Sequence, residues 1–179
     1  MKSPHPTKDS GRIILGAVLA VLVFAADQGS KYWVLHGLDL PARGDVPVIP
    51  MLLDLTMVWN HGVTFGLLQA HGVLGQSILG LIAVAVVVGL FAWLRRAESA
   101  LVAACIGAIA GGALGNVADR FRFGMVVDFL HLHWGAFDPF PFVFNIGDSA
   151  IVVGVAVLLL DSLRSPKPTA DAPPAQPPA

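Results

Sequence analysis

Two acidic residues, Asp128 and Asp148, stand apart because the sequence offers neither of them a local partner. Neither has a lysine or arginine three or four residues away, so a helical ion pair does not account for them. Asp128 lies in the apolar run 125–130, which favours its neutral form. Asp148 falls in the first turn of a predicted helix, where the helix dipole favours the ionised form. Two such carboxyl groups, if brought together, can share one proton and activate water for attack on a carbonyl.

Further polar side chains gather near the same ends of the predicted membrane spans. Asp27 and Lys31 are four residues apart with the acid first, which favours an ion pair on a helix. Other polar residues close one apolar span or open another: Asn116, Asp119, Arg120 and Asn145. Ionisable groups inside a membrane cost several kcal/mol, so such a gathering indicates a polar network or a functional site. We assign Asp27, Lys31 and Asp119 to a structural polar network.

Other chemistries fit the sequence less well. Asp128, His131 and His133 loosely resemble a metal-binding cluster, but their spacing matches no established pattern. The single cysteine, Cys105, lies within an apolar span and excludes an intramolecular disulfide or a site with several cysteines. Ser149 lacks a histidine base nearby in the sequence. We therefore expect neither a metal nor a cofactor.

The composition indicates a membrane protein. Of the 179 residues, 55% are hydrophobic and only 13% are charged, whereas soluble domains carry about 25% charged residues. Four segments have roughly the 20 apolar residues that a bilayer requires: residues 12–36, 71–94, 99–118 and 145–163. The predicted fold is therefore an all-α membrane protein with a four-transmembrane-helix bundle. The net charge of −1 provides no basic surface for nucleic acid.

Basic residues predict the orientation of this bundle. Seven of the eleven lysines and arginines lie on one side of the predicted spans: Lys2, Lys8, Arg12, Arg95, Arg96, Arg164 and Lys167. The positive-inside rule then places both termini in the cytoplasm, with residues 1–11 as a cytoplasmic N-terminus and 164–179 as a disordered, proline-rich tail. The outward loops are residues 39–70, with strand-forming sequence, and residues 121–144, which are rich in aromatic residues.

Five motifs in this order resemble the bacterial lipoprotein signal peptidase family, also called signal peptidase II, over about residues 12–163. They are Asp27-Gln28-x-x-Lys31, Asn60-x-Gly62-x-x-Phe65-Gly66, Gly111-Gly112-x-x-Gly115-Asn116-x-x-Asp119-Arg120, Val126-Val127-Asp128-Phe129 and Phe144-Asn145-Ile146-Gly147-Asp148. Each motif alone is weakly specific, but five in order within four spans are strongly so.

The resemblance implies an aspartyl endopeptidase without a cofactor. It implies cleavage of signal peptides from diacylglyceryl-modified prolipoproteins, just before the lipidated cysteine, by a monomer in the bacterial inner membrane with its site near the outer leaflet. Asp128 and Asp148 would be catalytic, and four residues would bind substrate or orient the site: Asn60, Asn116, Arg120 and Asn145. Residues 39–70 would form a small β-sheet cradle, and the aromatic loop would carry a short helix.

Two other functions remain as alternatives. A small proton-coupled transporter or channel subunit would use the same acids as a proton relay. It predicts polar residues at the membrane midplane, where the second and fourth spans have almost none. A structural assembly factor gives no reason for two unpaired acids near the membrane surface.

Overall fold

The computed structural model describes residues 6–62, 72–135 and 142–164. The helical elements are α1 (Pro6–Tyr32), the π-helical turn η1 (Trp33–Gly37), α2 (Leu40–Arg43), α3 (Gly72–Leu94), α4 (Ala100–Phe123) and α5 (Ile146–Arg164). The strands are β1 (Asp45–Ile49), β2 (Leu53–Asn60), β3 (Val126–Leu132) and β4 (Val143–Phe144). Phe65 and Gly66 of the second motif, and the proline-rich tail from residue 165 on, lie outside the described residues.

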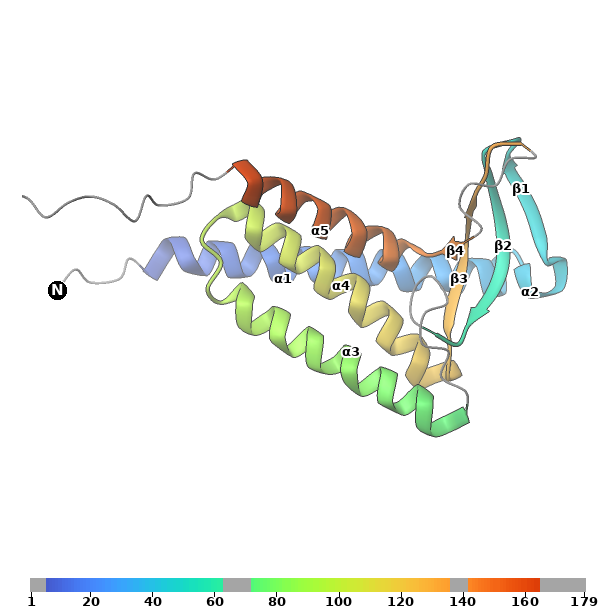
Figure 1. The fold of residues 1–179 in the computed structure, drawn as a ribbon, viewed down its shortest axis with the longest axis horizontal. Helices are drawn as coiled ribbons and strands as arrows, with labels where there is room; N and C mark the ends of the chain where they lie inside the picture. The colour runs from blue at the N-terminus through green and yellow to red at the C-terminus, as the bar shows by residue number, and fades with distance from the viewer. Residues whose placement is uncertain (1–5, 63–71, 136–141, 165–179) are drawn as a thin grey trace, which may run out of the picture.

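The long helices form a bundle with the sheet at one end, which we call the sheet end (Figure 1). Within the described residues, four helical stretches are long and apolar enough to cross a membrane: Ser10–Gly37, Gly75–Leu94, Ala100–Phe123 and Ile146–Arg164. This agrees with the predicted fold class. The third helix continues five residues beyond the predicted end at 118, because Gly124 caps it with a positive φ of 72° and an N–H donated to Arg120.

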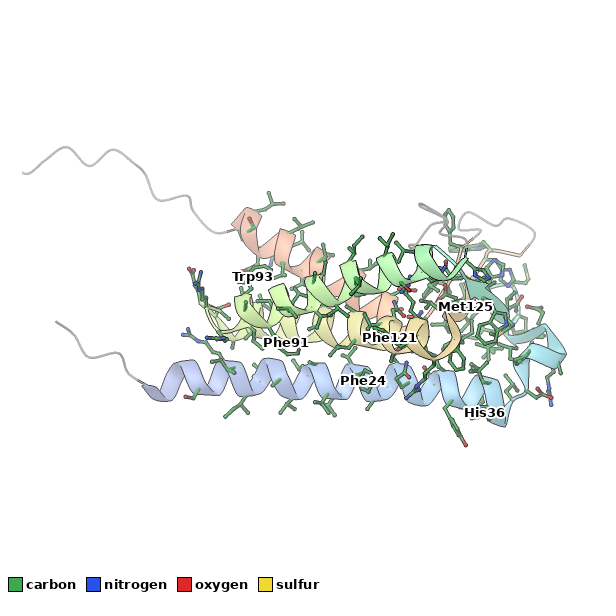
Figure 2. The ribbon with its side chains drawn as sticks, turned by 90° about the horizontal axis from the view of Figure 1, so that it is seen from below. Phe24, His36, Phe91, Trp93, Phe121 and Met125 are labelled. Carbon is green, nitrogen blue, oxygen red and sulfur yellow. The ribbon has the colours of Figure 1, made fainter. Side chains whose placement is uncertain are left out.

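Helix α4 is the centre of the bundle. In the most apolar 18-residue stretch of α4, 61% of the residues are buried, compared with 17% in the corresponding stretch of each of the other three long helices. Glycines permit this close packing: a Cβ on Gly107 or Gly111 would collide with the backbone of α1, and one on Gly112 with the carbonyl of Gly147 in α5. In Figure 2, Phe91 and Trp93 lie toward the far end of the bundle, while Phe121 and Met125 lie beside the sheet.

The sheet draws on both of the loops predicted to face outward. Its antiparallel order is β1-β2-β3-β4, with Asp128 of β3 opposite Val58 of β2 and Leu130 opposite Phe144 of β4. The expectation of a sheet made from residues 39–70 alone was therefore too narrow, because the β-branched and apolar run after Gly124 pairs with β2 as a strand.

The short helical elements follow α1, in residues 33–43, and the described part of the aromatic loop contains strands where we expected a short helix. One face of the sheet packs against these elements in a buried cluster of Val34, Leu40, Leu55, Val127 and Phe129. This cluster ties β3 to the end of α1. It therefore fixes the strand that carries Asp128 relative to the helix bundle.

Candidate active site

The polar residues selected from the sequence lie on elements that meet where the helix bundle joins the sheet, a junction that Figure 1 shows. Five elements position them: α1 carries Asp27 and Lys31, β2 ends at Asn60, α4 carries Asn116, Asp119 and Arg120, β3 carries Asp128, and α5 carries Asp148 and is directly preceded by Asn145. Hydrogen bonds connect all nine of these residues, directly or through a backbone group. Residues spread over more than a hundred positions of the sequence thus form one polar cluster in an otherwise apolar bundle.

Asp128 is completely buried in β3. Its Oδ2 accepts a hydrogen bond of 2.8 Å from Asn60 Nδ2, and its Oδ1 accepts one of 2.6 Å from Asn145 Nδ2. Burial and, second, the charge of Asp148 raise the pKa of Asp128 to about 7, while the hydrogen bonds from the two asparagines act in the opposite direction. This carboxyl group therefore retains a proton far above the pH at which an exposed aspartate loses it.

Asp148 lies in the first turn of α5, and Asn145 caps that turn. Asn145 Oδ1 accepts a hydrogen bond of 2.8 Å from the Asp148 N–H, while the Asn145 N–H donates to Asp148 Oδ2 at 3.3 Å. This reciprocal pair is the asparagine–aspartate form of a capping box. Asn116 Nδ2 donates to the other carboxylate oxygen, Oδ1, at 2.8 Å. Both oxygens of Asp148 are thus held in place.

Lys31 lies at the centre of the supporting network. Its buried ammonium contacts Asp27 Oδ2 at 2.7 Å, Asp119 Oδ2 at 2.8 Å and Asn116 Oδ1 at 3.0 Å. Asp119 Oδ2 also accepts the backbone N–H of Val127 at 3.1 Å. Asp119 therefore anchors β3 to α4 at the residue that precedes Asp128.

Asp27 positions the start of α5 in the same way. Its Oδ1 accepts a hydrogen bond of 2.9 Å from the backbone N–H of Gly147, one residue before Asp148. A Cβ on Gly115 would collide with Oδ2 of Asp27, so the glycine makes room for this buried carboxylate. Gln28, which sequence reasoning named only within its motif, donates to Asp119 Oδ1 at 2.9 Å and to the Gly115 carbonyl at 3.1 Å.

Arg120 connects α4 to the end of β2. Its guanidinium donates to the Gly62 carbonyl at 2.8 Å and to the Asn116 carbonyl at 3.2 Å, and Asn60 Oδ1 accepts the Gly62 N–H at 2.9 Å. The Nε of Arg120 is buried and has no hydrogen-bond partner within the part of the chain that the structure describes. The hydrogen bonds of Arg120 to described residues thus go to backbone carbonyls.

A cleft of about 500 Å³ opens beside this arginine, between the sheet ends of α3 and α4. Arg120 lies at one wall, and the rest of the lining is mostly apolar, including Leu81, Phe121, Phe123 and Met125. The polar cluster thus borders a cavity that suits an apolar ligand with a few polar groups.

The metal alternative finds no geometric support among residues 6–62, 72–135 and 142–164. Within these ranges no three histidine, cysteine, aspartate or glutamate side chains converge as metal ligands. His133 Nε2 lies 3.0 Å from Asp54 Oδ2, whereas Asp128 is held by two asparagines. The loose sequence pattern of Asp128, His131 and His133 is therefore not a spatial cluster.

Comparison with known proteins identifies the family. The family model described as signal peptidase (SPase) II matches residues 19–164. The lipoprotein signal peptidase of Methylorubrum extorquens is 46% identical over 155 residues, covering 87% of this chain and 88% of the relative. That of Rhodopseudomonas palustris is 40% identical over 151 residues, covering 83% and 92%. A solved bacterial membrane enzyme has a TM-score of 0.71 at 28% identity, covering 83% of this chain and 87% of that chain.

None of these similar proteins supports the transporter alternative. The matched residues begin at residue 19, within α1, and include the other three long helices. They also include every polar residue of the site. The match extends through most of the chain and most of each relative, so it concerns most of the membrane domain. The chain belongs to the signal peptidase II family.

Proposed function

We propose that this protein is an aspartyl endopeptidase that removes signal peptides from diacylglyceryl-modified prolipoproteins, cutting just before the lipidated cysteine. The observation that carries the aspartyl mechanism is the position of Asn145. Its side-chain N–H₂ donates to Asp128. Its backbone N–H donates to the Asp148 carboxylate, and its Oδ1 accepts the backbone N–H of Asp148. A single residue thus holds two carboxyl groups from different elements in one site. Family membership supports the signal-peptide substrate.

The charges of the site favour one shared proton on this pair. The described cluster contains four aspartates, Asp27, Asp119, Asp128 and Asp148, and two cations, Lys31 and Arg120. If all four aspartates were ionised, the cluster would carry a net charge of −2. One proton shared by the two carboxyl groups without a cation reduces this charge to −1. The raised pKa of Asp128 supports this aspartate as the holder of the proton.

The chemistry then follows from the two protonation states. The ionised carboxyl takes a proton from water while that water's oxygen attacks the scissile carbonyl, and the neutral carboxyl donates its proton to the carbonyl oxygen. Collapse of the tetrahedral intermediate breaks the C–N bond: one carboxyl of the dyad, Asp128 and Asp148, gives the proton taken from water to the leaving amine, and the other takes back a proton from a hydroxyl of the intermediate as the carbonyl re-forms, so that the pair again holds one proton. We assign Asn60, Asn116 and Asn145 to orienting the dyad and Arg120 to binding substrate beside it.

Within the membrane we place both termini in the cytoplasm and the sheet end at the outer face of the bacterial inner membrane. The basic residues support this orientation, because Arg12, Arg95, Arg96 and Arg164 lie at the end of the bundle opposite the sheet. A lipid-modified cysteine reaches the same outer interface, where water is available for hydrolysis. We further propose that the enzyme acts as a monomer.

The substrate class can be tested with purified protein. Incubation with a diacylglyceryl-modified precursor is expected to release a fragment whose mass corresponds to a new N-terminal lipidated cysteine. An unlipidated version of the same precursor, with alanine replacing cysteine, is expected to be cut at least about 100-fold more slowly, because lipid anchoring supplies binding and positioning. Equal cleavage of both precursors would contradict the lipid requirement.

The raised pKa of Asp128 predicts how activity responds to pH. Since the dyad needs one proton, kcat/KM should fall as the pH rises through about 7 and Asp128 ionises. Asn60→Ala removes a donor that favours the ionised form, which raises the pKa of Asp128 further. The basic limb of the pH profile, where kcat/KM falls as the pH rises, should therefore move to higher pH. The expected shift is about half a pH unit for a hydrogen bond worth about 0.7 kcal/mol.

This prediction is measured as kcat/KM from pH 5 to 9 for the wild type and Asn60→Ala. The height of the profile also reports any substrate contact of Asn60, whereas the midpoint of its basic limb reports the dyad. A limb that stays in place or moves to lower pH would contradict the assignment of Asp128 as the proton holder.

A further inference from the structure

The buried ammonium of Lys31 restricts how its neighbours can be oriented. An ammonium group has three N–H donors and no acceptor, so each partner must present an oxygen. The three partners are Asp27 Oδ2, Asp119 Oδ2 and Asn116 Oδ1, at 2.7, 2.8 and 3.0 Å. All three donors are thus used, and the amide oxygen of Asn116 must face Lys31.

The orientation of the Asn116 amide determines the hydrogen bonds that both members of the dyad, Asp128 and Asp148, accept. With its Oδ1 turned toward Lys31, Asn116 presents Nδ2 to Asp148 Oδ1, 2.8 Å away. Asn145 Nδ2 also donates to Asn116 Oδ1, at 3.1 Å, and to Asp128 Oδ1, at 2.6 Å. If the Asn116 amide turned by 180°, its oxygen would face the Asp148 carboxylate and its N–H₂ would face that of Asn145. Neither contact is compatible with the present donors.

The other charged groups around Lys31 do not duplicate this role. On α1 and α4 they are Asp27 and Asp119, which are acceptors, and Arg120, which donates to backbone carbonyls. From α5 and β3 the dyad itself, Asp148 and Asp128, faces the ammonium. Lys31 is therefore the cation that determines which face of the Asn116 side chain meets the dyad.

We propose that Lys31 is a positioning residue of the peptidase, whose ammonium orients the side-chain amides of Asn116 and Asn145 so that both donate to the dyad. This inference rests on the proposed function, since it concerns the rate of the same reaction. It differs from a purely structural ion pair because it predicts a change in the chemical step in molecules that remain folded.

The test compares a double variant, which lacks Lys31 and Asp119, with the single variant that lacks only Asp119. Lys31→Met alone would leave Asp27 and Asp119 buried without a cation, so it is combined with Asp119→Asn, which keeps the net charge of the cluster. Asp119→Asn alone serves as the reference that retains the ammonium. Each purified enzyme is assayed with a diacylglyceryl-modified precursor peptide in detergent micelles from pH 5 to 9, well below its unfolding temperature.

Relative to Asp119→Asn, the double variant is expected to lose about 10- to 100-fold in kcat, the effect of misplacing groups at a reacting centre. KM should change less than about threefold, because Lys31 is buried beneath the dyad's asparagines and is 2% exposed. The basic limb should also move to higher pH, since the charge of Lys31 lowers the pKa of Asp128. A smaller amount of folded enzyme, by contrast, scales the whole profile and leaves the midpoint of the limb in place once the rates are normalised to the folded fraction measured at each pH.

Two outcomes separate the inference from the proposed function. If kcat and the pH profile match those of Asp119→Asn, Lys31 has no positioning role, although the peptidase assignment stands. If Asp128→Asn and Asp148→Asn, assayed in parallel, retain normal cleavage, the proposed function itself fails. Should the double variant show no cooperative unfolding transition, Lys31→Gln with Asp119→Asn takes its place. That variant lacks the charge but keeps an N–H₂ donor, so the limb should still move while kcat falls less.

Discussion

Asp128→Asn and Asp148→Asn are each expected to abolish cleavage of a lipidated precursor, with a loss of about 10³-fold or more in kcat. Asparagine has nearly the shape of aspartate but cannot take a proton from water, and it cannot donate an acidic proton to the carbonyl. Each substitution therefore removes one of the two chemical roles that the shared proton supports. The measurement is single-turnover cleavage by purified enzyme, followed on gels or by mass spectrometry.

Both variants should remain folded and inserted in the membrane. Ionisation of Asp128 works against folding: its raised pKa means that the fold loses stability as the pH rises from about 4 to about 7. Asparagine removes that cost, while its amide fits less well opposite the donors of Asn60 and Asn145. These effects oppose each other, so at pH 8 the unfolding temperature of Asp128→Asn should stay within about 5 °C of the wild type.

Asp39→Asn is the matched control for both substitutions. Asp39 is exposed, makes no side-chain cap to α2 and has a positive φ of 53°, a conformation that asparagine also tolerates. It should cleave at the wild-type rate. Normal cleavage by Asp128→Asn or Asp148→Asn would exclude the aspartyl mechanism, whatever the result for the control.

The sequence allowed the bundle and the identity of the polar residues to be predicted, for physical reasons. Apolar stretches of about 20 residues have few alternatives to a transmembrane helix. A buried carboxyl group is costly enough that each one stands out against such a background. Asp27, Lys31 and Asp119 could be assigned to a network from this cost and from helical spacing, and their contacts are ion pairs in the structure.

The pairing of the second loop could not be predicted because it depends on contacts distant in sequence. A short apolar run such as Val126–Leu132 fits a strand or a buried loop equally well, and only β2 decides between them. The end of α4 was placed too early because Asp119 and Arg120 mark a change in polarity, not a break in the helix. Hydrogen bonding continues to the left-handed cap at Gly124.

The connecting role of Asn145 was also beyond sequence reasoning. An asparagine before a helix indicates an N-cap, and Asn145 does cap α5 through its Oδ1. Its Nδ2, however, reaches Asp128 on a different element, seventeen residues earlier in the chain. Local patterns give the first contact, but only the tertiary arrangement that brings Asp128 beside the residue preceding α5 gives the second.

Asp119→Asn is expected to lower the free energy of unfolding by about 2–3 kcal/mol. The buried carboxylate accepts hydrogen bonds from Gln28, Lys31 and the Val127 N–H, and an amide replaces one of its oxygens with a donor. Breaking a buried ion pair costs about 3–5 kcal/mol, and the remaining contact of Lys31 with Asp27 keeps the loss below that range. The measurement is thermal or denaturant unfolding in detergent, followed by tryptophan fluorescence.

Activity should fall together with stability in this variant, in contrast to the dyad variants. The Val127 contact holds β3 in place, so its loss loosens the strand that carries Asp128, and cooling or a stabilising lipid should restore part of the cleavage rate. Asp45→Asn, at an exposed position in β1, controls for the loss of a carboxylate, and because its amide oxygen can still accept the hydrogen bond from Thr56 Oγ1, stability should change by less than about 0.5 kcal/mol. If Asp119→Asn kept full stability yet lost all cleavage at every temperature, Asp119 would belong to the catalytic machinery, and its assignment to the structural network would be wrong.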